Sequence, residues 1–266
     1  MSIVHAPEAP EAPAASRADH VRARRPHALI PLAIGVAWGL AVLAELTGDG
    51  AKLHHDALIH SALPLWAALL LFLVSWQAMI AAMMLPSSLP MIALFQSVTS
   101  TQPRRRTVMT TFVGGYAAVW TAFGGAAFLG DVVFHRFVDR TPWLGARPWL
   151  IEAAVLALAG AFQFSSLKDR CLSVCRAPGP YLLQHYRRRG PAAALRLGVG
   201  HGLFCLGCCW ALMLLMFAAG VANLWWMAAL TAVMVYEKIG RHGDRITRPV
   251  GFALLALAAA VVAHGL

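Results

Sequence analysis

Charged side chains are scarce in this chain. Asp, Glu, Lys and Arg make up 13% of the 266 residues, about half the share that is usual in a soluble domain. Hydrophobic residues make up 59%, and the mean hydropathy is +0.64. This composition excludes an ordinary soluble globular domain. It predicts an all-α, polytopic helical membrane protein that lies in a lipid bilayer.

Two functional signatures are also absent. The sequence has no G-x4-G-K-[ST] loop, which argues against a pump driven by nucleotide hydrolysis. The formal net charge is +10, but no basic face with interleaved aromatic residues is present, so we expect no nucleic-acid partner. Basic residues beside membrane-spanning helices are explained by orientation and by anionic headgroups.

Seven apolar segments can be read along the chain, each near or above the ~20 residues that a helix needs to span the hydrocarbon. They cover residues 28–46, 64–96, 108–129, 149–167, 192–219, 222–237 and 247–264. The second segment holds Pro86 and Pro90 in the sequence MMLPSSLPM. Proline removes a helical hydrogen bond, so we expect a break or re-entrant bend near Pro86.

The distribution of basic residues predicts the orientation. Residues 1–27, 97–107, 168–196 and 238–248 carry 18 of the 22 Lys and Arg residues. The opposite side receives only Lys52, Arg136, Arg140 and Arg147. This positive-inside pattern places the N-terminus in the cytoplasm and the C-terminus outside, for a chain with seven spans.

The chain divides into a leader and a helical domain. Residues 1–27 are polar and rich in Ala and Pro, which predicts a disordered cytoplasmic tail. Residues 28–266 form the predicted transmembrane domain. The apolar run continues from Ala28 to Ala44 without a small-residue cleavage site, which favours a retained signal anchor.

Three of the five cysteines lie in one apolar run, HGLFCLGCCW, at residues 201–210. With Cys205 as zero on an α-helix, His201 lies at about −40°, Cys208 at about −60° and Cys209 at about +40°. Met216 falls at about +20° in the same sector. Thiolate, thioether and imidazole are the donors that soft metals prefer. The run therefore predicts a buried metal site, with helix packing by small residues such as Gly198 and Gly202 as the alternative.

The other two cysteines, Cys171 and Cys175, lie one helical turn apart and share a face. Lys168, Arg170 and Arg176 surround them with positive charge, which favours the thiolate. This pair is predicted as a cytoplasmic metal site. Along a straight helix that begins near Pro191, residues 205–209 lie roughly 21–27 Å from the start. We therefore expect the two cysteine sets to be separated by a sizeable part of the membrane unless the connecting loop folds back. Such a separation favours a relay or permeation path over a single five-cysteine site.

Several sequence elements resemble a known family. The elements CLxxCR and GCCWALM, within about residues 75–240, resemble a bacterial family of unknown function described as predicted metal-binding integral membrane proteins. Some of its members carry a copper-related label. The resemblance implies a membrane protein that handles metal and supplies no mechanism. The matching positions are Cys171, Cys175, His201, Cys205, Cys208, Cys209 and Glu237.

Charge and softness favour Cu(I) over Zn(II) as the metal. Three thiolates around a monovalent ion would leave net negative charge in a region of low dielectric constant, which is costly. We therefore expect one of the three cysteines to be protonated or not to be a ligand. The expected function is transport, relay or delivery of the ion, with a metal chaperone or metalloenzyme as partner, and the interpretation favours a non-enzymatic role.

Two other functions remain open on the sequence. The first is a membrane thiol–disulfide protein, although a C-x2-C pair in mid-helix strains a disulfide. The second is an assembly factor whose cysteines serve helix packing.

Overall fold

The computed structural model describes residues 29–48, 55–187, 189–219 and 223–265. The predicted tail at residues 1–27 lies outside the described residues. Within the described ranges all regular secondary structure is helical and no strand is present. The all-α class predicted from the sequence is therefore confirmed.

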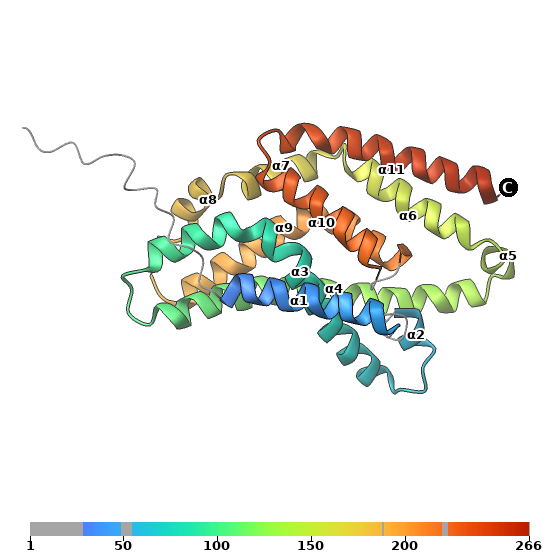
Figure 1. Ribbon diagram of the computed structural model, residues 1–266, viewed down its shortest axis with the longest axis horizontal. Helices are drawn as coiled ribbons and strands as arrows, with labels where there is room; N and C mark the ends of the chain where they lie inside the picture. The colour runs from blue at the N-terminus through green and yellow to red at the C-terminus, as the bar shows by residue number, and fades with distance from the viewer. Residues whose placement is uncertain (1–28, 49–54, 188, 220–222, 266) are drawn as a thin grey trace, which may run out of the picture.

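Helices account for nearly all of the described chain (Figure 1). In chain order they are α1 (Leu29–Thr47), α2 (His55–Ile59), α3 (Leu65–Thr99), α4 (Arg105–Asp139), α5 (Pro142–Gly145), α6 (Pro148–Phe162), α7 (Ser166–Arg176), α8 (Pro178–His185), α9 (Pro191–Ala219), α10 (Leu224–Ile239) and α11 (Gly243–Gly265).

Each of the seven predicted segments coincides with a helix, but fewer helices have the length of a membrane span. Among the described residues, α1, α3, α4, α9 and α11 are long and apolar enough to cross a bilayer. Helices α6 and α7 together would make a sixth span, bent by 63°. Helix α10 has 16 residues, short of the ~20 that a full crossing needs. The structure therefore supports five or six spans.

Large apolar side chains are exposed on the outside of the bundle. They include Leu43, Val74 and Phe252, each more than half exposed. A soluble protein rarely leaves so many such side chains in water, whereas lipid accepts them. The long apolar helices are thus compatible with membrane insertion.

Helix α3 corrects the expected break. It runs as one helix through both Pro86 and Pro90. Pro86 cannot donate to the carbonyl of Ala82, four residues earlier. The indole Nε1 of Trp38 in α1 donates to that carbonyl instead, at 3.0 Å. A hydrogen bond from a neighbouring helix thus satisfies the freed backbone group, and the helix continues.

Close packing of α4 against α9 forms the centre of the molecule. A Cβ atom built on Gly198 would collide with the carbonyl of Phe112, and one on Gly115 would lie 2.6 Å from the carbonyl of Leu195. Small residues at these positions let the two backbones approach. The predicted packing role of Gly198 is therefore confirmed, and it fixes how α9 faces α4.

The chain turns sharply after α6 and brings α7 back onto α9. Ser165 caps α7, because its side-chain oxygen accepts a hydrogen bond from the backbone N–H of Lys168 at 3.1 Å. Gly207 provides the contact surface on α9, where an added Cβ would lie 2.5 Å from the Cys171 sulfur. Helix α7 thereby meets the middle of α9, and α11 lies along α6 (Figure 1).

Candidate functional site

Helix α9 points all four of its predicted site residues into the protein. The side chains of Cys205, Cys208 and Cys209 have no exposed surface, and His201 is 3% exposed. The side chain of Cys209 donates to the Cys205 carbonyl at 2.9 Å, and that of Cys208 donates to the same carbonyl at 3.1 Å. The thiols therefore lie on both sides of one carbonyl and open toward different neighbouring helices.

On one side of α9, a buried ammonium group sits among sulfur atoms. Lys238, near the end of α10, is 4% exposed. Its Nζ donates to Cys205 Sγ at 3.1 Å and lies 4.0 Å from Cys209 Sγ. The Sδ of Met84 is also 4.0 Å from Nζ, and it is 3.8 Å from Cys209 Sγ. Two thiols and a thioether from α9 and α3 thus converge on one cation.

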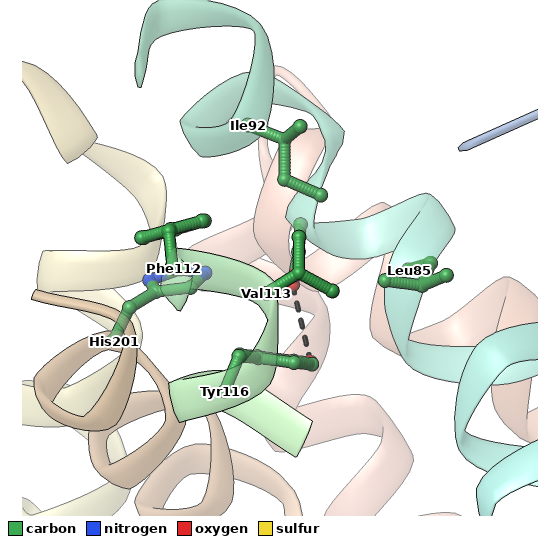
Figure 2. Close-up of a pocket in the computed structure, with 7 residues that line it drawn as sticks. Leu85, Ile92, Phe112, Val113, Tyr116 and His201 are labelled. Carbon is green, nitrogen blue, oxygen red and sulfur yellow. Dashed lines mark hydrogen bonds between the residues drawn. The ribbon is translucent and has the colours of Figure 1, made fainter. Parts of the chain in front are cut away.

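Hydroxyl groups complete this sulfur cluster. Ser87 in α3 accepts a hydrogen bond from Lys238 Nζ at 3.1 Å. The phenol oxygen of Tyr116 in α4 lies 3.2 Å from Cys205 Sγ and accepts a hydrogen bond from Ser88 at 3.2 Å. The dashed line in Figure 2 is the hydrogen bond from Ser88 to Tyr116. The polar groups of Ser87 and Ser88 therefore face the cluster next to the prolines of α3.

A small cavity lies beside Tyr116 and His201 (Figure 2). Its volume is about 10 Å³, about the space of one water molecule. The His201 ring stacks near Tyr116, with ring centroids 5.6 Å apart. Its Nε2 is buried and has no hydrogen-bond partner in the described part of the chain. The Nε2 atom of His201 is thus a nitrogen ligand that no hydrogen bond within the described residues occupies.

On the other side of α9, the second cysteine set meets the first. Cys171 lies against Gly207 of α9, where an added Cβ would be 2.5 Å from its sulfur, and Cys175 interacts electrostatically with Cys208. The connection between the two sets does fold back, because the bend of 63° after α6 brings α7 onto α9. The two cysteine sets are therefore not separated.

A buried ion pair ties α7 to α10 at the same level. Lys168 Nζ donates to Glu237 Oε2 at 2.8 Å and to the Cys208 carbonyl at 3.1 Å. Arg176 Nη1 donates to the carbonyls of Glu237 and Gly240, at 2.6 and 3.0 Å. Glu237, expected from the family resemblance as a metal ligand, thus has one carboxylate oxygen engaged by an ammonium group. Its Oε1 has no partner among the described residues.

The structure does not hold a preformed metal shell. Across the described ranges, no three His, Cys, Asp or Glu side chains are gathered closely enough to hold a metal ion. All five cysteines are free thiols. Met216 is fully buried in the core, but Met84 is the methionine placed next to a cysteine. The cluster is organised around the Lys238 ammonium.

The sequence places Lys168 beside Cys171 and Cys175 but gives no indication of its ion pair with Glu237. Lys238 is the member of this site that the sequence analysis missed, because it follows an apolar segment like the basic residues that orient the chain. One signal did point to Lys238, because it directly follows Glu237 in the YEK element of the resemblance. Tyr116 gave no local signal, since its approach to Cys205 depends on the crossing of α4 and α9.

The donors that meet here fit a soft metal ion. Thiolates and a thioether prefer Cu(I) to hard cations, and the site is closed to solvent. The family model PpoB2, described as copper chaperone, matches residues 73–261. No curated protein and no solved structure matches the chain.

Proposed function

Because the chain belongs to the PpoB2 copper chaperone family, we propose that it is an integral membrane protein that carries Cu(I) as cargo on buried cysteine thiolates. One observation carries the proposal. The thiols of Cys205 and Cys209 and the thioether of Met84 converge on the Lys238 ammonium in a place closed to water. A cation already sits where these donors meet, and soft sulfur ligands favour Cu(I).

The second cysteine set, Cys171 and Cys175, provides a route for the ion to the site formed by Cys205, Cys209 and Met84. Cys175 and Cys208 meet across the contact of α7 and α9, and Cys208 is adjacent to Cys209 in sequence. An ion bound at Cys171 and Cys175 can therefore reach Cys209 by short exchanges between neighbouring thiolates. The relay that we propose is compact and crosses α9 at one level.

His201, Met216 and Glu237 take supporting roles in the proposal. His201 lines the cavity beside Tyr116, and its buried Nε2, which has no hydrogen-bond partner among the described residues, offers a neutral metal ligand near Cys205. Met216 offers a thioether about two helical turns beyond Cys209 in α9. Glu237 holds Lys168 in place, which makes it a positioning residue for the Cys208 backbone.

The orientation of the chain completes the proposal. The bias of basic residues places α7 and the end of α10 toward the cytoplasm of a bacterial inner membrane. This division requires the short helix α10 to return the chain to the side of α7, where its end meets Arg176. Without the buried Lys168 and Lys238, sixteen basic residues then face four. Cu(I) would then pass to or from a cytoplasmic metal chaperone, or to a metalloenzyme in the membrane.

A competition titration tests the proposal. Full-length protein in detergent, kept without oxygen, is titrated with Cu(I) against the chelator bicinchoninate, and bound copper is counted by elemental analysis. Cys205→Ser and Cys209→Ser are each expected to weaken Cu(I) binding by more than about a hundredfold, beyond what outer-shell changes usually cost. Cys171→Ser should have a smaller effect, because its thiol faces Gly207. A wild-type chain that binds no Cu(I) would contradict the proposal.

A second candidate function rests on the contact of Cys175 with Cys208. These thiols come from different helices, so a disulfide between them avoids the strain of a pair within one helix. Its formation would release two electrons and two protons, which a membrane quinone could accept. Titration of free thiols and mass spectrometry of peptides distinguish the two functions. Five thiols that survive exposure to an oxidised quinone exclude the redox function.

A further inference from the structure

Lys238 is a buried cation without a carboxylate. In the described part of the chain its hydrogen-bond acceptors are the Cys205 sulfur and the Ser87 hydroxyl, at 3.1 Å each, and the sulfur atoms of Cys209 and Met84, at 4.0 Å each. The nearest acid in sequence, Glu237, directs Oε2 to Lys168. Burial of an ammonium group in a closed site is costly unless negative charge compensates it. The sulfur atom of Cys205 accepts from the ammonium group and is the group placed to supply that charge as a thiolate. The thiol of Cys209 donates to the Cys205 carbonyl and becomes a second thiolate when a metal ion replaces its proton.

Lys238 therefore adds one fixed positive charge to the group of donors. Lys168 and Glu237 form a pair in which the two charges cancel. Once the Cys209 proton has been released on metal binding, Lys238 and the two thiolates together carry a net charge of −1. Addition of a monovalent ion makes it neutral, whereas addition of a divalent ion leaves a charge of +1 in a region of low dielectric constant.

We infer that Lys238 is the residue that selects a monovalent soft ion over a divalent one at this site. The inference rests on the proposed function, because it assigns metal selectivity to the same cluster. Softness alone does not separate Cu(I) from Zn(II), since thiolates bind both. The fixed charge of Lys238 separates them by electrostatics.

The lysine side chain is suited to this role. Its ammonium lies on a flexible four-carbon stem, and it also donates a hydrogen bond to Ser87, which belongs to a different helix from Cys205 and Cys209. When the ion binds between the sulfur atoms, Nζ can keep the Ser87 hydroxyl and move away from sulfur. The charge then stays in the site while the place among the sulfur atoms becomes free.

Two pairs of ions with equal electron counts test the inference on the wild-type chain. Cu(I) and Zn(II) are one pair, and Ag(I) and Cd(II) are the other. Within each pair the ions differ by one unit of charge. Affinities are measured by competition with chelators of known affinity, on full-length protein in detergent and without oxygen. The monovalent ion of each pair is expected to bind at least about a hundredfold more tightly, relative to the same pair on a dithiol peptide.

Substitution of Lys238 by a neutral residue should remove this added preference. Lys238→Met removes the charge and keeps the length of the side chain. It is expected to lower the ratio of Cu(I) to Zn(II) affinity by about a hundredfold, with the same direction for Ag(I) and Cd(II). Lys238→Arg keeps the charge and should keep the order of preference. If Lys238→Met does not fold, Lys238→Gln replaces it, because its amide can still bond to Ser87.

The outcomes separate the two claims. A wild-type chain that binds Cu(I), with an unchanged affinity ratio in the neutral variants, overturns the role of Lys238 and leaves the proposed function standing. Equal binding of both ions of each pair by the wild type overturns it as well. A wild-type chain that binds none of the four ions overturns the proposed function itself.

Discussion

Helix α9 has a buried lysine on either side of it, and the two lysines are neutralised by different chemistry. Lys168, from α7, pairs with the carboxylate of Glu237 at 2.8 Å. Lys238, from α10, donates to the thiol of Cys205 and the hydroxyl of Ser87. A carboxylate with an ammonium is a lasting ion pair, whereas a thiolate can exchange its cation for a soft metal. The ion pair of Lys168 therefore stabilises the packing of α7 against α10. In the proposed function, the contact of Lys238 with Cys205 is the one that a metal ion replaces.

The largest expected effect comes from breaking the α7 side. Lys168→Met leaves the Glu237 carboxylate buried without its cation, so we expect the free energy of unfolding to fall by about 3–5 kcal/mol. Thermal unfolding of the full chain in detergent measures the change. The double variant Lys168→Met/Glu237→Met removes both charges and should recover most of the loss. A single variant as stable as the wild type would show that the pair does not fasten α7 to α10.

A smaller effect is expected where α7 touches α9. Gly207→Ala places a Cβ atom against the Cys171 sulfur, at 2.5 Å in the present packing, and forces the two helices apart. We expect a loss of about 1–3 kcal/mol in unfolding free energy and faster alkylation of Cys171 by a thiol reagent. Gly114→Ala is the matched control, because nothing lies within 4 Å of a Cβ atom there. Equal behaviour of the two variants would refute the tight contact.

The smallest expected effect sharpens the Lys238 side. Met84→Leu keeps the volume of the side chain but removes the thioether that lies 3.8 Å from Cys209 Sγ. We expect Cu(I) affinity to fall by about tenfold, or about 1.4 kcal/mol, with little change in stability. Met91→Leu, at another buried position of α3, should leave the affinity unchanged. An affinity loss of the same size in both variants would remove Met84 from the proposed ligands.

Much of the fold could be predicted because each of the long helices coincides with a long apolar run in the sequence. The runs at 64–96 and 192–219 end within a few residues of α3 and α9. The break near Pro86 could not be judged from the sequence, since it depends on Trp38 reaching Ala82 from another helix. The count of seven spans was also too simple. The length of α10 and the bend between α6 and α7 reduce the candidates in the described chain to five or six.

The candidate site was predictable only where one helix determines it. Helical periodicity of 100° per residue places His201, Cys205 and Cys209 in one sector, and all three are buried. The approach of Cys175 to Cys208 depends on the bend of the chain after Phe162. The sequence does not reveal how far this bend brings α7 toward α9. Lys238 looked like a charge at a membrane surface, because position in sequence does not reveal which polar groups another helix brings.

The Trp38 indole has a consequence for how this protein can be shortened. Residue 38 precedes the segment that matches the family, yet its N–H group satisfies a carbonyl inside that segment. The Ala82 residue that carries the carbonyl is fully buried, so removal of α1 would leave that carbonyl without its donor. In the membrane environment that we propose, water could not replace the donor. A fragment limited to residues 73–261 would therefore lack the hydrogen bond that stabilises α3 beside Pro86. A redesign of this protein has to keep its first helix.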